Sequence, residues 1–119
     1  TGTHDNNTTV GWWSGASDHE RHHARAYLGT DGHDIAWAMM RAAAASVADT
    51  VVHPMQDVLG LGREARMNRP GIAEGNWTFR LRSGDLAGGS AARLLELATT
   101  YGRAASPRQS DRTPKNEAK

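Results

Sequence analysis

The sequence has no cysteine among its 119 residues. Disulfide bonds and thiolate metal sites are therefore excluded, and the chain suits a reducing compartment, so we expect a cytoplasmic location. Long apolar runs are missing too, since no stretch approaches the roughly 20 residues that a membrane-spanning helix needs. No signal peptide is visible, and we expect no contact with a membrane.

An excess of charge is equally absent, because 14 basic and 13 acidic residues leave a net charge of +1. The basic residues are mostly arginines spread along the chain, so we expect no binding to nucleic acid. Apolar residues make up only 38% of the sequence, and many of them are alanine. We therefore expect one small domain with a thin core, which gives little support for independent folding.

The first part of the chain predicts a loop followed by a helix. Residues 1–16 contain two glycines around paired tryptophans and show no helical period, so we expect a loop there. Ser17 can cap a helix, and Glu20 completes a capping box. The helix should run to about Leu28, end at Gly29 and remain solvated, because its apolar stripe is narrow.

Two further helices are expected. The first begins at Ile35, where apolar residues follow the helical spacing. Trp37, Met40 and Val47 are expected to widen its buried face. The second helix is capped by Ser90 and is amphipathic. Its apolar residues are Ala91, Leu94, Leu95, Ala98 and Tyr101.

The segment between these two helices has strand and loop patterns. Residues 50–52 are a short β-branched run, which predicts a parallel strand buried on both faces. A short helix is expected over residues 55–61, a loop over residues 67–75 and a brief extended segment over residues 77–81. A helix followed by a buried strand indicates the α/β class.

Three sequence strings are the most specific feature of the chain. His4 and Asp5 lie in GTHDNNTTVGWW, and PMQDVLGLGREARMNRPG and EGNWTFRLR follow it in that order. An adjacent His and Asp alone would be weak support, since such pairs occur by chance in many proteins. Together the strings closely resemble the amylomaltases, which are the 4-α-glucanotransferases of glycoside hydrolase family 77. The resemblance covers residues 1 to about 103.

This resemblance implies the closing portion of a (β/α)8 TIM barrel. A complete barrel of this kind needs about 250 residues, so it would be incomplete in this chain. Residues 1–103 would form the C-terminal part of the catalytic barrel. Residues 104–119 are polar and lack an apolar period, so we expect a disordered tail. The first residue is threonine instead of methionine, which suggests a processed or truncated chain.

The resemblance also implies a retaining transfer of α-1,4-glucan segments between maltooligosaccharides, with no metal or organic cofactor. Asp5 corresponds to the family's third catalytic carboxylate, which would stabilise the transition state. His4 and Asn68 would bind the sugar, although Asn68 could instead support a turn before Pro70. The nucleophile and the acid/base would precede Thr1, so the 119 residues alone are expected to be inactive.

Other interpretations remain open at this point. The chain could be a non-catalytic glucan-binding remnant that uses its tryptophans, or His4 and Asp5 could bind a metal in an HD-type phosphohydrolase. The Gly-Thr loop around the pair argues against the second alternative. His19 and His23 have the spacing of a metal pair, but exposed histidines without an HExxH motif explain them better. Gln56 and Asp57 fit a loop-bracing role better than a binding role, and the tryptophans fit packing roles at least as well as sugar stacking.

Overall fold

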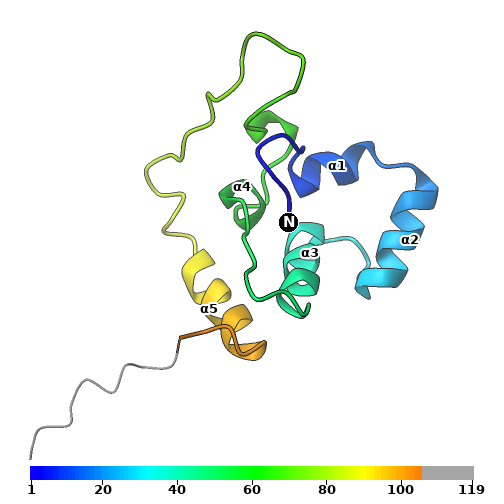
Figure 1. Cartoon of the computed structure of the whole chain (residues 1–119), viewed down its shortest axis with the longest axis vertical. Coiled ribbons are helices and arrows are strands. Elements are labelled where there is room, and N and C mark those ends of the chain that lie inside the picture. The colour runs from blue at the N-terminus through cyan, green and yellow to red at the C-terminus, as the bar shows by residue number, and fades with distance from the viewer. Residues whose placement is uncertain (106–119) are drawn as a thin grey trace, which may run out of the picture.

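The computed structural model describes residues 1–105, and every regular element in this part of the chain is helical. In Figure 1 the N-terminal segment and α3 lie near the centre, with the other helices around them. None of the described helices is long and apolar enough to cross a membrane. The predicted tail falls almost entirely outside the described residues. The elements are α1 Thr9–Gly15, α2 Asp18–Leu28, α3 Ile35–Ala44, α4 Met55–Val58, the 3-10 turn η1 Arg63–Ala65 and α5 Ser90–Thr100.

Helix α1 corrects the prediction of a loop over residues 1–16. Thr8 caps this helix, because its Oγ1 accepts a hydrogen bond from the Gly11 amide at 3.0 Å. The amide of Thr9 donates at 2.7 Å to the carboxylate of Asp57, which lies 48 residues further along the chain. This distant partner satisfies a helix donor that no local residue supplies.

Helix α2 agrees with the prediction. The Ser17–Glu20 capping box is present, and Gly29 ends the helix in the left-handed conformation at φ +61°. None of its residues is buried. Arg21 and Arg25 place their guanidinium groups 5.9 and 5.5 Å from the centre of the Trp13 ring. These cation–π contacts join the solvated helix to α1.

Helix α3 forms where the sequence predicts a helix and provides most of the core, and Met40 is fully buried. Trp37 is also buried, and its indole Nε1 donates to the Val58 carbonyl at 3.2 Å, which joins α3 to α4. The prediction that Val47 widens the buried face is wrong, because α3 ends at Ala44 and Val47 is fully exposed.

The described residues contain no β-strand, so the predicted strand at residues 50–52 does not form in this chain. Strands require hydrogen-bonded neighbours, and one contact is present here: the Thr1 amino group donates to the Val52 carbonyl at 2.8 Å. Val52 is 70% exposed, because nothing in the described chain covers it. The α/β class is therefore not visible in residues 1–105, where the regular structure is helical.

The end of α4 and the start of α5 differ slightly from the predictions. Helix α4 stops at Val58, and the chain turns at Gly60 in the left-handed region instead of continuing to residue 61. In α5, Ser90 is the first helical residue, and Gly89 occupies the cap position.

The apolar face of α5 is narrower than its sequence predicts. Leu94 and Leu97 pack against the core formed by Trp37, Met40 and Val58. Leu95 is 63% exposed, so it does not join this face.

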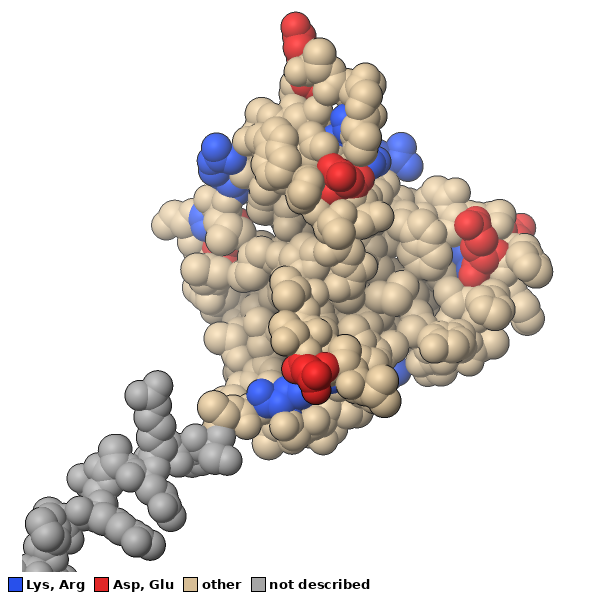
Figure 2. Space-filling model, viewed as in Figure 1, with Lys and Arg blue, Asp and Glu red and all other residues tan. Residues whose placement is uncertain are grey.

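Charged side chains are scattered over the surface. On the face shown in Figure 2, the arginines form small separate groups among uncharged residues, and acidic side chains lie close to several of them. No continuous basic surface is visible on this face, which is consistent with the composition.

Candidate functional site

The site begins with a tight turn that presents His4 and Asp5. The amide and hydroxyl of Thr3 donate to Asn6 Oδ1 at 2.7 and 3.0 Å, and the amide of Asn6 donates back to the Thr3 carbonyl at 3.1 Å. Short polar side chains stabilise such turns by bonding to nearby backbone groups. As a result the His4 and Asp5 side chains are 55% and 48% exposed.

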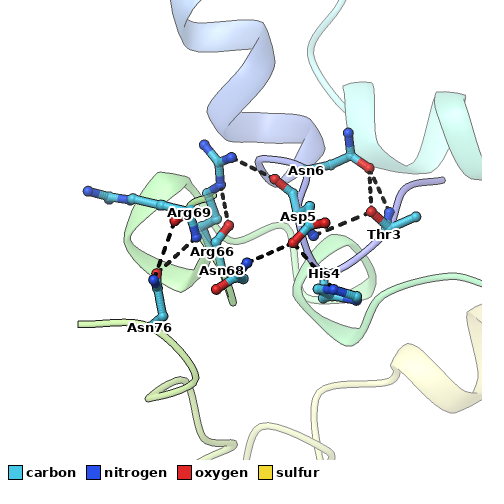
Figure 3. Close-up of polar contacts among 8 residues, drawn as sticks. All are labelled: Thr3, His4, Asp5, Asn6, Arg66, Asn68, Arg69 and Asn76. Atoms are coloured by element: carbon cyan, nitrogen blue, oxygen red, sulfur yellow. Dashed lines mark hydrogen bonds and ion pairs between the residues drawn. The ribbon is translucent and has the colours of Figure 1, made fainter. Parts of the chain in front are cut away.

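The carboxylate of Asp5 is held on one side only (Figure 3). Asn68 Nδ2 donates to Asp5 Oδ1 at 2.7 Å, and His4 Nε2 lies 3.3 Å from the same oxygen. Asp5 Oδ2 has no hydrogen-bond partner within residues 1–105. One oxygen is therefore held by Asn68 with His4 beside it, while the other is open to a ligand.

Arg66 links the turn to the loop that contains Asn68. Its Nη2 donates to the Asp5 carbonyl at 2.6 Å, and its Nε donates to the Asn68 carbonyl at 2.9 Å. The Asn68 amide in turn donates to the His4 carbonyl at 3.0 Å. Backbone and side-chain hydrogen bonds thus converge on the His4–Asp5 turn. The sequence alone does not indicate this role for Arg66.

Trp77 closes the far end of this loop. Its amide donates to the Met67 carbonyl at 2.7 Å, and its ring lies against the His4 imidazole with 5.0 Å between centroids. The indole is 53% exposed, so Trp77 is not a core residue. Trp12 and Trp13, by contrast, are partly buried and lie 6.0 Å apart.

Asp57 and Gln56 brace the structure, as the sequence predicts. Asp57 is buried and accepts hydrogen bonds from the Thr1 hydroxyl at 2.6 Å and from the Thr9 amide and hydroxyl at 2.7 and 2.9 Å. Gln56 Nε2 donates to the Ala65 carbonyl at 3.2 Å. Both side chains are therefore occupied in positioning the segments around the site.

A cavity of about 220 Å³ borders the site. His4, Asn6, Arg66 and Trp77 are among its lining residues. Val52, Pro54 and Met67 also line it, and Asp5 and Asn68 do not. The cavity therefore lies beside the Asp5 carboxylate and does not enclose it.

Within residues 1–105, no group of three or more His, Asp or Glu side chains is placed to hold a metal ion. His19 and His23 lie on the exposed helix α2, and the His23 ring stacks on Tyr27 with 6.4 Å between centroids. Asp5 accepts a hydrogen bond from the Asn68 side-chain amide, and the His4 imidazole lies 3.3 Å from the same oxygen.

Comparisons with known proteins show which proteins the chain resembles. A sequence profile described as 4-alpha-glucanotransferase matches residues 1–86. The 4-alpha-glucanotransferase of Thermus thermophilus is 46% identical over 104 residues, which cover 82% of this chain and 21% of that protein. The chloroplastic/amyloplastic enzyme of Arabidopsis thaliana is 44% identical over 106 residues, covering 86% of this chain and 18% of the relative.

The fold also resembles a solved structure, the amylomaltase from Streptococcus agalactiae in complex with acarbose. The TM-score is 0.84 at 33% identity, over 88% of this chain and 21% of the other. The chain thus spans about a fifth of the length of the curated relatives, at 21% and 18%.

Proposed function

Because the chain belongs to the 4-alpha-glucanotransferase family, we propose that it forms one part of a site that transfers α-1,4-glucan segments between maltooligosaccharides. The reaction is a retaining double displacement, in which a carboxylate attacks the anomeric carbon and a protonated carboxyl donates to the leaving oxygen. A hydroxyl of the acceptor sugar then resolves the covalent intermediate. The same site would bind the glucan donor and acceptor.

Asp5 is the catalytic residue of this chain in the proposal, and the arrangement of its two oxygens is the observation that supports it. Oδ1 is held by Asn68 and lies next to His4, while the half-exposed carboxylate leaves Oδ2 available. A preorganised group of this kind can bind a sugar hydroxyl without rearranging during the reaction. His4 and Asn68 complete the substrate-binding set.

The charge of Asp5 supplies a second contribution. Two carboxylates in one site disfavour each other's ionisation, so Asp5 would raise the pKa of the acid that protonates the leaving oxygen. We infer that the nucleophile and this acid come from outside these 119 residues, since the chain spans about a fifth of its relatives' length. The 119 residues alone are therefore expected to be inactive.

The same proposal extends to the architecture. We infer that residues 1–103 contribute the closing portion of a (β/α)8 barrel, in which residues 50–52 form a strand. The Thr1–Val52 hydrogen bond and the likeness to an amylomaltase structure support this inference. A cytosolic location is part of the proposal, because a cysteine-free sequence suits a reducing compartment.

The test is the Asp5→Asn variant of the complete enzyme, meaning the polypeptide that joins these residues to the two other carboxylates. We expect kcat for maltotriose disproportionation to fall roughly a hundredfold to a thousandfold, the range for loss of one transition-state contact. Asp49→Asn makes the same charge change at an exposed position beyond the end of α3 and should leave kcat unaltered. Equal kcat in both variants would exclude Asp5 from catalysis.

A glucan-binding role without catalysis predicts a different result. In that case the complete polypeptide would bind maltooligosaccharides, and no transfer products would appear even before mutation. Calorimetric titration beside the disproportionation assay separates the two functions.

A further inference from the structure

Trp77 has an unusual backbone conformation. Its φ is +61°, and no other non-glycine residue within residues 1–105 has a positive φ. Bulky side chains are unfavourable in this left-handed region and remain there only when the surroundings hold them. Here the Trp77 amide donates to the Met67 carbonyl at 2.7 Å, and Arg80 Nη1 donates to the Trp77 carbonyl at 3.0 Å.

The loop between Asn68 and Trp77 is tied together internally. Asn76 Oδ1 accepts a hydrogen bond from the Arg69 amide at 2.9 Å, and Asn76 Nδ2 donates to the Ile72 carbonyl at 2.8 Å. With the Trp77–Met67 bond, these contacts fix both ends of the loop relative to each other. Glycine would fit the left-handed position more readily than tryptophan. A tryptophan at this position therefore indicates that its side chain has a function.

That role is visible at His4. The Trp77 ring lies 5.0 Å from the imidazole at an angle of 40°, and Nε2 of the same imidazole lies 3.3 Å from Asp5 Oδ1. His4 is thus placed between an aromatic ring and a carboxylate. The His4 side chain is 55% exposed, so little else restricts its rotamer.

We propose that Trp77 is a positioning residue for the glucan transfer. Its indole fixes the His4 ring so that Nε2 remains beside Asp5 Oδ1, and Oδ2 then stays free for the sugar. One loop consequently sets both groups on Oδ1: its first part supplies Asn68, and its last part orients His4. This role rests on the proposed function of Asp5.

The kinetic signature of positioning differs from that of direct sugar contact. If Trp77 acts through His4, its loss misplaces the Asp5 carboxylate in the transition state and lowers kcat. If the indole instead stacked on bound sugar in the ground state and the transition state alike, its loss would raise KM and leave kcat unchanged. The two parameters therefore separate the mechanisms.

The variants are Trp77→Gly and Trp77→Phe in the complete enzyme. Glycine suits the positive φ and removes the ring, so it tests the side chain without adding backbone strain. Phenylalanine keeps an aromatic ring beside His4. We expect Trp77→Gly to lower kcat roughly tenfold to a hundredfold, the effect of a small misplacement of a catalytic group. KM should change little, and Trp77→Phe should retain most of the activity.

A direct readout of His4 accompanies the kinetics. With histidine labelled by ¹³C at Cε1, the His4 signal is assigned through its loss in His4→Gln. The ring current of the Trp77 indole in the wild type, and that of the phenyl ring in Trp77→Phe, should displace this signal, and the displacement should disappear in Trp77→Gly. Trp12→Phe, which changes an indole on α1 outside the site, is the control and should alter neither the signal nor kcat.

The outcomes are distinct. An unchanged His4 signal in Trp77→Gly, an unchanged kcat, or a rise in KM at constant kcat would each overturn the positioning role. A wild-type enzyme that transfers no glucan would instead refute the proposed function. In that case the His4 signal still decides whether Trp77 orients the imidazole, so the two failures cannot be confused.

Discussion

Asn68 Nδ2 donates a 2.7 Å hydrogen bond to Asp5 Oδ1 from a position 63 residues away in the chain. This bond fixes the carboxylate from the loop that follows η1, and the Asn68 amide also donates to the His4 carbonyl at 3.0 Å. The side chain and backbone of one residue therefore hold both members of the His4–Asp5 pair.

Replacing Asn68 tests this arrangement. Asn68→Ala removes the side-chain donor and leaves the backbone bond to His4 in place, so the carboxylate loses its orientation but the loop remains. We expect kcat of the complete enzyme to fall roughly tenfold to a hundredfold because the carboxylate is misplaced. Asn68→Asp should be more damaging at neutral pH, since it places a negative charge against Asp5. Steady-state kinetics of the wild type and both variants test this. A kcat of Asn68→Ala equal to that of the wild type would argue against a role for the Asn68 side-chain donor.

Local patterns made part of the fold predictable. The Ser17–Glu20 capping box and the stop at Gly29 depend on residues three positions apart or on one glycine, and both are confirmed. The first turn of α1 was missed because Asp57, which accepts from the Thr9 amide, lies 48 residues away. The strand at residues 50–52 could not be judged from its own sequence, since pairing depends on neighbours.

The candidate site shows the same division. His4, Asp5 and Asn68 were identified through a family resemblance, and the structure brings the three together. Whether Asp5 is catalytic stays a prediction. The sequence predicts a packing or stacking role for Trp77, and its contact with His4 depends on a backbone φ of +61° that tryptophan seldom adopts. Sequence alone does not indicate such a conformation.

Asp57 should be important for stability and not for chemistry. Its buried carboxylate accepts hydrogen bonds from Thr1 and Thr9, and it lies at the start of α1, where a negative charge is favourable. Asp57→Ala should lower the free energy of unfolding by about 3 kcal/mol, because donors to a charged group lose their acceptor. Urea denaturation of the complete enzyme measures the change, with exposed Asp49→Ala as the control. If Asp57→Ala lowers the free energy of unfolding by less than the control does, water replaces the carboxylate without loss of stability.

Arg93 joins α5 to α3 by two contacts whose contributions can be separated. Its guanidinium carbon lies 3.9 Å from the centre of the Trp37 ring, and it forms an ion pair with Asp34. Exposed ion pairs contribute little, so stacking on the buried Trp37 should dominate. Arg93→Lys is expected to lower the free energy of opening of α5 by about 1 kcal/mol, almost as much as Arg93→Ala.

Hydrogen exchange of the α5 amides gives the comparison. Asp34→Asn removes the ion pair alone and should leave exchange protection in α5 nearly unchanged. If Asp34→Asn speeds hydrogen exchange of the α5 amides as much as Arg93→Ala does, the ion pair is the dominant contact and the stacking argument is wrong.

His53 should make folding stability depend on pH. Burial lowers its pKa from 6.5, and the positive Thr1 amino group and Arg103 act in the same direction, while Asp57 opposes them. Its Nδ1 is buried and has no hydrogen-bond partner within residues 1–105. The unfolded chain therefore binds a proton more readily than the folded one, and stability is lost as pH falls from about 6.5 through the lower folded value.

Removing His53 should abolish this part of the pH dependence. The His53→Gln variant cannot take up the proton, so its denaturation midpoint should vary less between pH 7.5 and pH 5 than that of the wild type. His33→Gln, a change at an exposed histidine, should keep the wild-type slope. Because several acidic groups also titrate below pH 5, the comparison is confined to this window. Parallel curves for the wild type and His53→Gln would show that protonation of His53 does not oppose folding.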